Sequence, residues 1–150
     1  MVSEVLEDLS ITDFSEGQTF SFQKTIDESD LTKFAQLSGD SNPLHMNDSF
    51  AKKQGFKGRV VYGLLLSSFF SKLVGMYLPG KKALLHSVNT RFLSPAYIND
   101  TIIVSAVIDQ ISLSTKILVL KGTIKNKDTG NLLVKGKIQV GFTQQFESND

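Results

Sequence analysis

The 150-residue sequence contains no cysteine and only two histidines. The absence of cysteine excludes disulfides, thiolate catalysis and zinc sites built on cysteine, and it fits the reducing cytoplasm in which we expect the protein. Two histidines without cysteine also argue against a metal site. We therefore expect chemistry that needs neither a metal nor a bound cofactor.

The sequence also lacks an excess of charge of either sign and an uninterrupted hydrophobic run. The net charge is +1, so no strong field marks a nucleic acid or a membrane as partner, although a local cationic patch could bind a phosphorylated ligand. The N-terminus shows no basic stretch followed by an apolar run, so no signal peptide is predicted. The most apolar segment, residues 60–78, contains serines and a lysine and ends at Pro79, which predicts a buried helix rather than a membrane span.

What is present predicts a single α+β domain. Residues 19–26 alternate polar and apolar side chains, as a half-buried strand does. Asp27 and Gly39 mark the beginning and the end of a helix, and Asn47 caps a shorter one. Residues 1–15 mix acidic and apolar side chains and form an N-terminal extension, either a short amphipathic helix or an arm.

The chain after Gly80 has the pattern of strands. Alternation, or runs of isoleucine and valine, predict four strands joined by hairpin-length connections, within residues 88–92, 101–108, 116–124 and 132–142. The antiparallel sheet must cover the apolar helix, and its edges stay exposed. Because edge-to-edge pairing of two sheets removes one edge from each, we expect a homodimer or a higher homo-oligomer.

An Asn-Pro turn separates a carboxylate from an imidazole five positions later. Asp40 follows the helix-ending Gly39, and Pro43 favours an extended backbone at the residue before it. We therefore expect Asp40 and His45 on a constrained loop rather than in a helix. Near pH 7 a carboxylate can take a proton while an imidazole gives or shares one, so the pair is a candidate general acid–base couple acting on one water.

The same residues also fit ordinary turn chemistry. Asp40 and Asn42 are typical of turns in which a side chain bonds nearby backbone amides. His45 could pack beneath the loop with its hydrogen bonds satisfied. The spacing alone leaves both interpretations open.

A longer stretch resembles a known family. Residues 34–51, Phe-Ala-Gln-Leu-Ser-Gly-Asp-Ser-Asn-Pro-Leu-His-Met-Asn-Asp-Ser-Phe-Ala, are similar to the signature of MaoC-like (R)-specific enoyl-CoA hydratases at every position of that signature. Three later segments resemble the family in order and spacing: Gly-Arg-Val-Val-Tyr-Gly-Leu-Leu (58–65), Leu-Pro-Gly-Lys (78–81) and Arg-Phe-Leu-Ser-Pro-Ala (91–96). The similarity spans residues 16–142, which leaves 1–15 as an extension and 143–150 as a C-terminal tail.

The resemblance implies a hot dog fold, in which a curved antiparallel sheet wraps a long central helix, usually in a dimer. It also implies reversible syn addition of water to a trans-2-enoyl thioester of coenzyme A or acyl carrier protein, giving an (R)-3-hydroxyacyl thioester. The residues it assigns are Asp40 and His45 to hold the water, Asn42 to orient it, Gly63 as the oxyanion donor, and Ser71 near the thioester pocket.

Physical chemistry supports the role of Gly63 separately. Conjugate addition places negative charge on the thioester oxygen, and a helix N-terminus offers unpaired amides with a partial positive charge. Glycine has no side chain to block the approach of that oxygen. We take Asp40 as the base and His45 as the proton donor to the α-carbon, although the two could share these roles through one water.

Two positions depart from the family pattern. Tyr62 stands where a histidine is usual, and Asn99 stands where a glycine is common. Tyr62 keeps a hydrogen-bonding tip, so we expect it to bind substrate or to tune the loop. Asn99 tolerates positive φ and can still turn the chain.

The other polar candidates carry weaker signals. Lys81 follows a Pro-Gly turn and could meet the phosphates of coenzyme A, although paired lysines are usually only solvated charge. His86 lies on a predicted strand, where we expect a half-exposed or hydrogen-bonded histidine rather than a catalytic one. Ser71 has no base beside it in sequence, so it is a polar contact and not a nucleophile.

The leading hypothesis is an enoyl thioester hydratase, or a dehydratase in the reverse direction. Two alternatives stay open: a hot dog thioesterase, whose water attacks the carbonyl carbon, and a noncatalytic acyl-thioester binding domain. The presence of Asp40, Asn42 and His45 favours catalysis over binding, and the signature favours hydration over hydrolysis.

Overall fold

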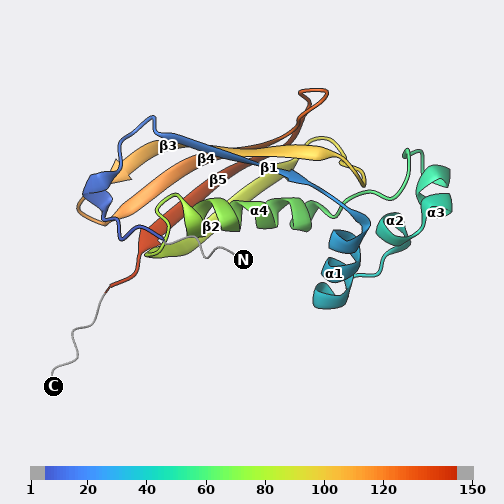
Figure 1. Cartoon of the computed structure of the whole chain (residues 1–150), viewed down its shortest axis with the longest axis horizontal. Coiled ribbons are helices and arrows are strands. Elements are labelled where there is room, and N and C mark those ends of the chain that lie inside the picture. The colour runs from blue at the N-terminus through green and yellow to red at the C-terminus, as the bar shows by residue number, and fades with distance from the viewer. Residues whose placement is uncertain (1–5, 145–150) are drawn as a thin grey trace, which may run out of the picture.

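The computed structural model describes residues 6–144 of the chain. A five-stranded antiparallel sheet arches over one long helix, and three short helices gather at one end of both (Figure 1). The strands are β1 (Thr19–Thr25), β2 (Ala83–Phe92), β3 (Thr101–Ser112), β4 (Ile117–Asn126) and β5 (Leu132–Phe142). The helices are α1 (Glu28–Ser38), α2 (Pro43–Met46), α3 (Asp48–Lys53) and α4 (Gly63–Met76), preceded by a 3-10 turn at Ile11–Asp13.

The sheet has the order β1-β3-β4-β5-β2, so β1 and β2 are its edges. All four strands predicted after Gly80 are present, and each extends beyond the predicted residues or matches them closely. Alternation places one face of each central strand in the core: in β5, Val134, Ile138 and Val140 are fully buried. The predicted α+β architecture, with an antiparallel sheet over an apolar helix, is therefore confirmed.

Phe70 of α4 fixes how closely the helix lies against the sheet. Its side chain is 1% exposed and lies over Gly122 and Gly136, which are partners in the β4–β5 ladder. A Cβ atom built on Gly122 would lie only 2.6 Å from Phe70 Cε1, and one on Gly136 would lie 3.1 Å from Cε2. Glycine at these two strand positions makes room for the ring.

The predicted helix caps are confirmed. Asp27 accepts a 2.8 Å hydrogen bond from the Asp30 N–H, and the Asp30 carboxylate accepts one of 3.0 Å from the Asp27 N–H. Gly39 ends α1 in the left-handed conformation with φ of 79°, and the Asn47 side chain caps α3. Asn99 has φ of 73°, as expected where it replaces a glycine.

The structure corrects the expectation that α4 is buried and completes the one about the N-terminal extension. One face of α4 is open, with Leu64 68% exposed, because no other element in the described part of the chain covers it. In its described part, residues 6–15, the N-terminal extension forms an arm with one 3-10 turn rather than an amphipathic helix: Ile11 and Phe14 insert into the core, and Phe14 packs near Phe142. Residues 1–5 of the extension and 145–150 of the tail lie outside the described residues.

Candidate active site

The segment between α1 and α4 carries both candidate catalytic side chains. Asp40 lies on the exposed loop that follows Gly39, as predicted. His45 instead lies in the one-turn helix α2, so the prediction that both residues lie on a loop is wrong for His45. The Asn42 side chain accepts a 2.9 Å hydrogen bond from the Leu44 N–H, and Pro43 suits the first helical position, so together they begin a helix.

The imidazole of His45 is held in one orientation. Its Nδ1 lies 2.7 Å from the backbone oxygen of Val60. A carbonyl oxygen can only accept, so Nδ1 carries the proton. Neutral His45 therefore has its free lone pair on Nε2, and this nitrogen can accept a proton from a water.

The carboxylate of Asp40 is oriented by its own loop. Its Oδ1 accepts a 3.0 Å hydrogen bond from the Asn42 N–H, and the Asp40 N–H donates to the Ser38 hydroxyl at 3.1 Å. Asn42 thus contributes its backbone amide to Asp40 and its side-chain oxygen to the cap of α2. It connects the two candidate catalytic residues structurally.

Tyr62 touches both of them. Its ring stacks on that of His45 with centroids 4.0 Å apart, and its hydroxyl donates to the backbone oxygen of Asp40. The side chain is 2% exposed. Burial raises the pKa of Tyr62 above its ordinary value, the charge of Asp40 raises it further, and Arg59 opposes both. The hydroxyl is therefore protonated and able to donate at neutral pH.

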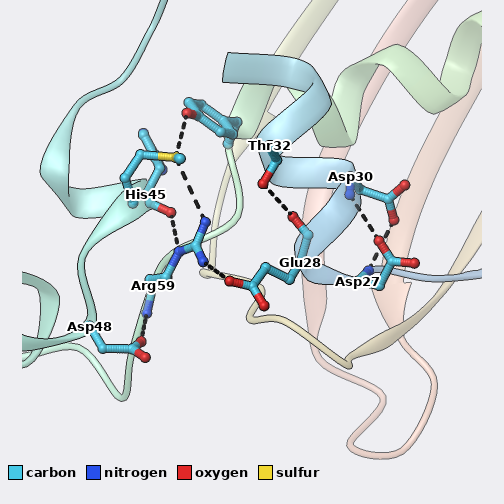
Figure 2. A network of polar contacts seen from close by, with 9 residues as sticks. Asp27, Glu28, Asp30, Thr32, His45, Asp48 and Arg59 are labelled. Carbon is cyan, nitrogen blue, oxygen red and sulfur yellow. Dashed lines mark hydrogen bonds and ion pairs between the residues drawn. The ribbon is translucent and has the colours of Figure 1, made fainter. Parts of the chain in front are cut away.

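Arg59 was not singled out from the sequence, yet it ties three elements together (Figure 2). Its Nε donates to the backbone oxygen of His45 at 2.7 Å, and one terminal nitrogen pairs with Glu28 of α1 at 2.9 Å. Its backbone N–H donates to Asp48 at 2.9 Å. The Arg59 side chain is 10% exposed, whereas that of Glu28 is 73% exposed. No local pattern predicts these contacts, because the partners lie 11 to 31 positions away in the sequence.

Gly63 and His45 line the same pocket, of about 390 Å³. Gly63 is the first residue of α4, where backbone amides have no partner within the helix. A Cβ atom at this position would lie 3.0 Å from the ring of Phe92, so a larger residue here would press on that ring. The rest of the lining is mostly apolar: Phe56, Val60, Val61, Leu66, Phe92, Leu93, Ser94, Pro95 and Ala96. Such a pocket suits an apolar ligand whose polar end meets Gly63 and His45.

The remaining predicted residues lie farther from this pocket. Ser71 is exposed on α4, about 12 Å along the helix from Gly63 at 1.5 Å per residue. Lys81 is exposed beyond the opposite end of α4, so the chain does not bring it to Gly63. His86 is exposed near the start of β2, where its ring covers Gly141 and lies 3.4 Å from the Gln139 amide. Its surface position agrees with the expected noncatalytic histidine.

The described residues also bear on metal binding and membrane crossing. Across residues 6–144, no three histidine, cysteine, aspartate or glutamate side chains come together in a way that could hold a metal ion. None of the helices in this range has the length and apolar character that a membrane crossing requires.

Known proteins resemble this chain in sequence and in fold. Residues 13–129 match the model of the MaoC like domain family. An (R)-specific enoyl-CoA hydratase of Rhodospirillum rubrum is 34% identical over 128 residues, which cover 85% of this chain and 88% of the relative. A mitochondrial 3-hydroxyacyl-[acyl-carrier-protein] dehydratase of Arabidopsis thaliana is 36% identical over 87 residues, covering 58% of this chain and 51% of the relative.

The fold comparison agrees with the sequence comparison. The solved structure of an (R)-hydratase from Aeromonas caviae, involved in PHA biosynthesis, superposes with a TM-score of 0.82 at 30% identity, covering 86% of this chain and 97% of that one. The predicted hot dog fold is thereby confirmed. The family model matches most of this chain, and the hydratase of Rhodospirillum rubrum is similar to it over 85% of its length. The chain therefore belongs to the MaoC-like domain family.

Proposed function

We propose that the protein is a hydro-lyase that adds water to trans-2-enoyl thioesters to give (R)-3-hydroxyacyl thioesters, or removes it in the reverse direction. The observation that carries the proposal is one apolar pocket lined by both His45 and the N-terminus of α4 at Gly63. Asp40 does not line this pocket, but its backbone oxygen accepts a hydrogen bond from Tyr62, whose ring stacks on His45. The hydratase and dehydratase names of the relatives support the same reaction class.

The tautomer of His45 favours a particular first step. With Nδ1–H bonded to Val60, neutral His45 has no proton on Nε2 to give, so it accepts one first. We therefore assign His45 as the base toward the water, in place of the initial assignment of Asp40. The Asp40 carboxylate accepts the second water hydrogen and offsets the positive charge that forms on the imidazole.

The complete step uses one water and one face of the substrate. An O–H bond of the water breaks, its proton moves to His45 Nε2, and the oxygen bonds to the β-carbon. The electrons of the C=C bond move to the thioester oxygen, which the Gly63 N–H stabilises. The α-carbon then takes the proton from Nε2, and His45 returns to its neutral form. Because one nitrogen handles the proton, hydrogen and hydroxyl add to the same face. The step needs no metal or cofactor.

Two other activities fit a hot dog pocket and give different products. A thioesterase would direct the water to the carbonyl carbon and release a free thiol. A binding domain would hold the thioester unchanged. The proposed chemistry differs from both because it removes the conjugated double bond and leaves the thioester intact.

The decisive experiment is an assay of the purified protein with crotonyl-CoA and with longer enoyl-CoA and enoyl-acyl carrier protein substrates. We expect loss of absorbance of the conjugated double bond without release of thiol, and an (R)-3-hydroxyacyl product by chiral chromatography. Thiol release at the same rate would instead identify a thioesterase. Binding without either change would identify a binding domain. The same panel sorts coenzyme A from acyl carrier protein and defines the preferred chain length.

We also propose that the chain works as a homodimer joined through β2. This strand is a sheet edge with β5 as its single neighbour in the sheet. Four large apolar residues on it are exposed: Leu84 51%, Leu85 45%, Val88 38% and Phe92 51%. A second copy would bury them and pair the free edge.

Light scattering at micromolar concentration tests the dimer. We expect at least twice the 16.5 kDa chain mass, and a shift toward monomer for Val88→Lys. A stable monomer of the parent protein would contradict the proposal. The cytoplasmic location remains a prediction, which cell fractionation tests.

A further inference from the structure

We propose that Tyr62 is a positioning residue whose hydroxyl group sets the placement of Asp40 relative to His45. This inference rests on the proposed function, since it assigns a role within the same site. The sequence left open whether Tyr62 binds substrate or tunes the loop, and its contacts favour the second role.

The contacts of Tyr62 reach every part of the candidate site. Its hydroxyl donates to the backbone oxygen of Asp40, and its ring stacks on His45 with centroids 4.0 Å apart. Phe34 of α1 packs against the same ring with centroids 4.7 Å apart. Along the backbone, Tyr62 directly precedes Gly63 and caps α4. The side chain of Tyr62 thus joins the carboxylate loop to the imidazole, and its backbone leads directly into the N-terminus of α4.

The hydroxyl is the long-range tie of the Asp40 loop. The other hydrogen bonds of Asp40 in the described part of the chain go to Ser38 and Asn42, each two positions away. Those local bonds shape the turn and join it to the cap of α2 at Asn42, but neither of them reaches the ring of His45. Only the bond to Tyr62 connects Asp40 across 22 positions to the residue that also stacks on His45.

The side chain is placed to position these groups rather than to meet substrate. Tyr62 is 2% exposed and is absent from the lining of the pocket that contains His45 and Gly63. Its raised pKa keeps the hydroxyl a donor.

Tyr62→Phe is the test, because it removes the hydroxyl and keeps the buried ring. We expect kcat for the best enoyl thioester to fall about tenfold while KM stays within about twofold, since substrate binding does not involve the hydroxyl. Tyr77→Phe is the matched control: Tyr77 also stacks on an aromatic ring, that of Phe20, but lies at the far end of α4. Its kcat should equal that of the parent.

A second readout does not depend on turnover. The Asn42 N–H bonds to the Asp40 carboxylate, so its resonance in a ¹H–¹⁵N spectrum reports the loop. We expect it to shift or broaden in Tyr62→Phe and to stay unchanged in Tyr77→Phe. If the parent protein hydrated no enoyl thioester, the hydratase proposal would fail, while this resonance would still test the positioning role.

Three results would overturn the inference. An unchanged kcat with an unchanged Asn42 resonance would show that the hydroxyl positions nothing. A raised KM with normal kcat would assign the hydroxyl to substrate binding. A loss of activity that only matched the loss of folded protein, measured by thermal melting, would reduce Tyr62 to a structural residue.

Discussion

The sheet with α4 and the segment from Gly39 to Tyr62 are held together by different forces. In the first, apolar side chains such as Phe70, Leu120 and Ile138 are fully or almost fully buried, and strand ladders satisfy the backbone. In the second, short helices and loops are mostly exposed, and side chains bond to backbone atoms of neighbouring turns. The free energy of apolar burial does not depend on direction, whereas these hydrogen bonds do.

This difference separates stability from chemistry. The core supplies most of the free energy of folding, so changes there should lower the melting temperature first. The site segment contributes less apolar burial but fixes the angles of Asp40 and His45. Changes there should lower kcat by more than the loss of folded protein explains.

The largest effect is expected at the candidate catalytic pair. Asp40→Asn and His45→Ala should each lower kcat by about 10²- to 10⁴-fold, the usual contribution of a general acid–base group. His45→Ala should also lose some stability, because the Val60 hydrogen bond and the Tyr62 stack disappear. Rates are therefore compared per folded molecule. His86→Ala, the other histidine, is the control and should leave kcat unchanged. Nearly full activity in either variant would refute the assignment.

In the core, Phe70→Ala should lower the free energy of unfolding by about 3 to 5 kcal/mol. Gly122→Ala should cost about 1 to 3 kcal/mol, because its methyl group would press on the Phe70 ring. The double variant Gly122→Ala with Phe70→Leu should cost less than the sum of the single changes Gly122→Ala and Phe70→Leu. Chemical denaturation of these three variants and of Phe70→Ala checks this. Additive costs would show that the two residues do not press on each other.

Arg59 tests the border between the two regions. Arg59→Met should lower stability by about 1 to 3 kcal/mol, because the His45 carbonyl loses a charged donor in a mostly buried place. It should lower kcat beyond the loss of folded protein. Glu28→Gln is the matched control and should change stability by less than about 1 kcal/mol, since Glu28 is largely exposed. Equal effects of the two variants would mean that the ion pair, and not the His45 contact, matters.

Gly63→Ala should lower kcat/KM about tenfold, roughly 1.4 kcal/mol, if its amide faces the thioester oxygen. The structure adds a complication, since the new methyl group would also meet the ring of Phe92. The parent protein and Gly63→Ala are therefore compared again after Phe92→Leu has been introduced into each. A loss that persists when the ring is gone supports the oxyanion role. Recovery in the Phe92→Leu background would assign Gly63 to packing alone.

The smallest effect concerns acid stability through the cap of α1. Burial alone would raise the pKa of Asp30, but hydrogen bonds from the Asp27 N–H and from Lys24 outweigh it and lower the pKa below its ordinary value. In the unfolded chain the pKa of this carboxyl group is about 3.9, and in the folded protein it is lower. The ionised group therefore stabilises the folded protein above pH ~3.9, and this stability is lost as the pH falls through the pKa of the folded state. Asp30→Asn should cost up to about 1 kcal/mol at pH 7 and flatten the melting profile between about pH 5 and 3. Parallel profiles would contradict this.

Local patterns were enough to predict the scaffold. Alternation marks strands because side chains of a strand point to opposite faces, and Asp27 and Gly39 mark α1 because helix ends need caps. The same patterns missed α2, which is too short for any periodicity to show. Its helical turn depends on one cap at Asn42 and one proline, which were interpreted as loop signals.

The candidate site was predictable only in part. Asp40, His45 and Gly63 were found through a family signature and through their chemistry. Arg59 and the burial of Tyr62 were not, because each depends on contacts between residues that only the fold brings together. Lys81 shows the converse case: a sequence motif drew attention to a residue that the chain places at the opposite end of α4.

The order of elements along the chain also matters while the protein is being synthesised. The apolar helix α4 leaves the ribosome before any of the strands β2 to β5 that cover it, and β1 must wait for β3. At about 5 to 20 residues per second, those strands take several seconds to appear. During that interval Leu66, Phe70 and Leu73 have no partner surface. Nascent chains stalled just after Met76 should therefore bind chaperones more strongly than chains stalled after Phe142.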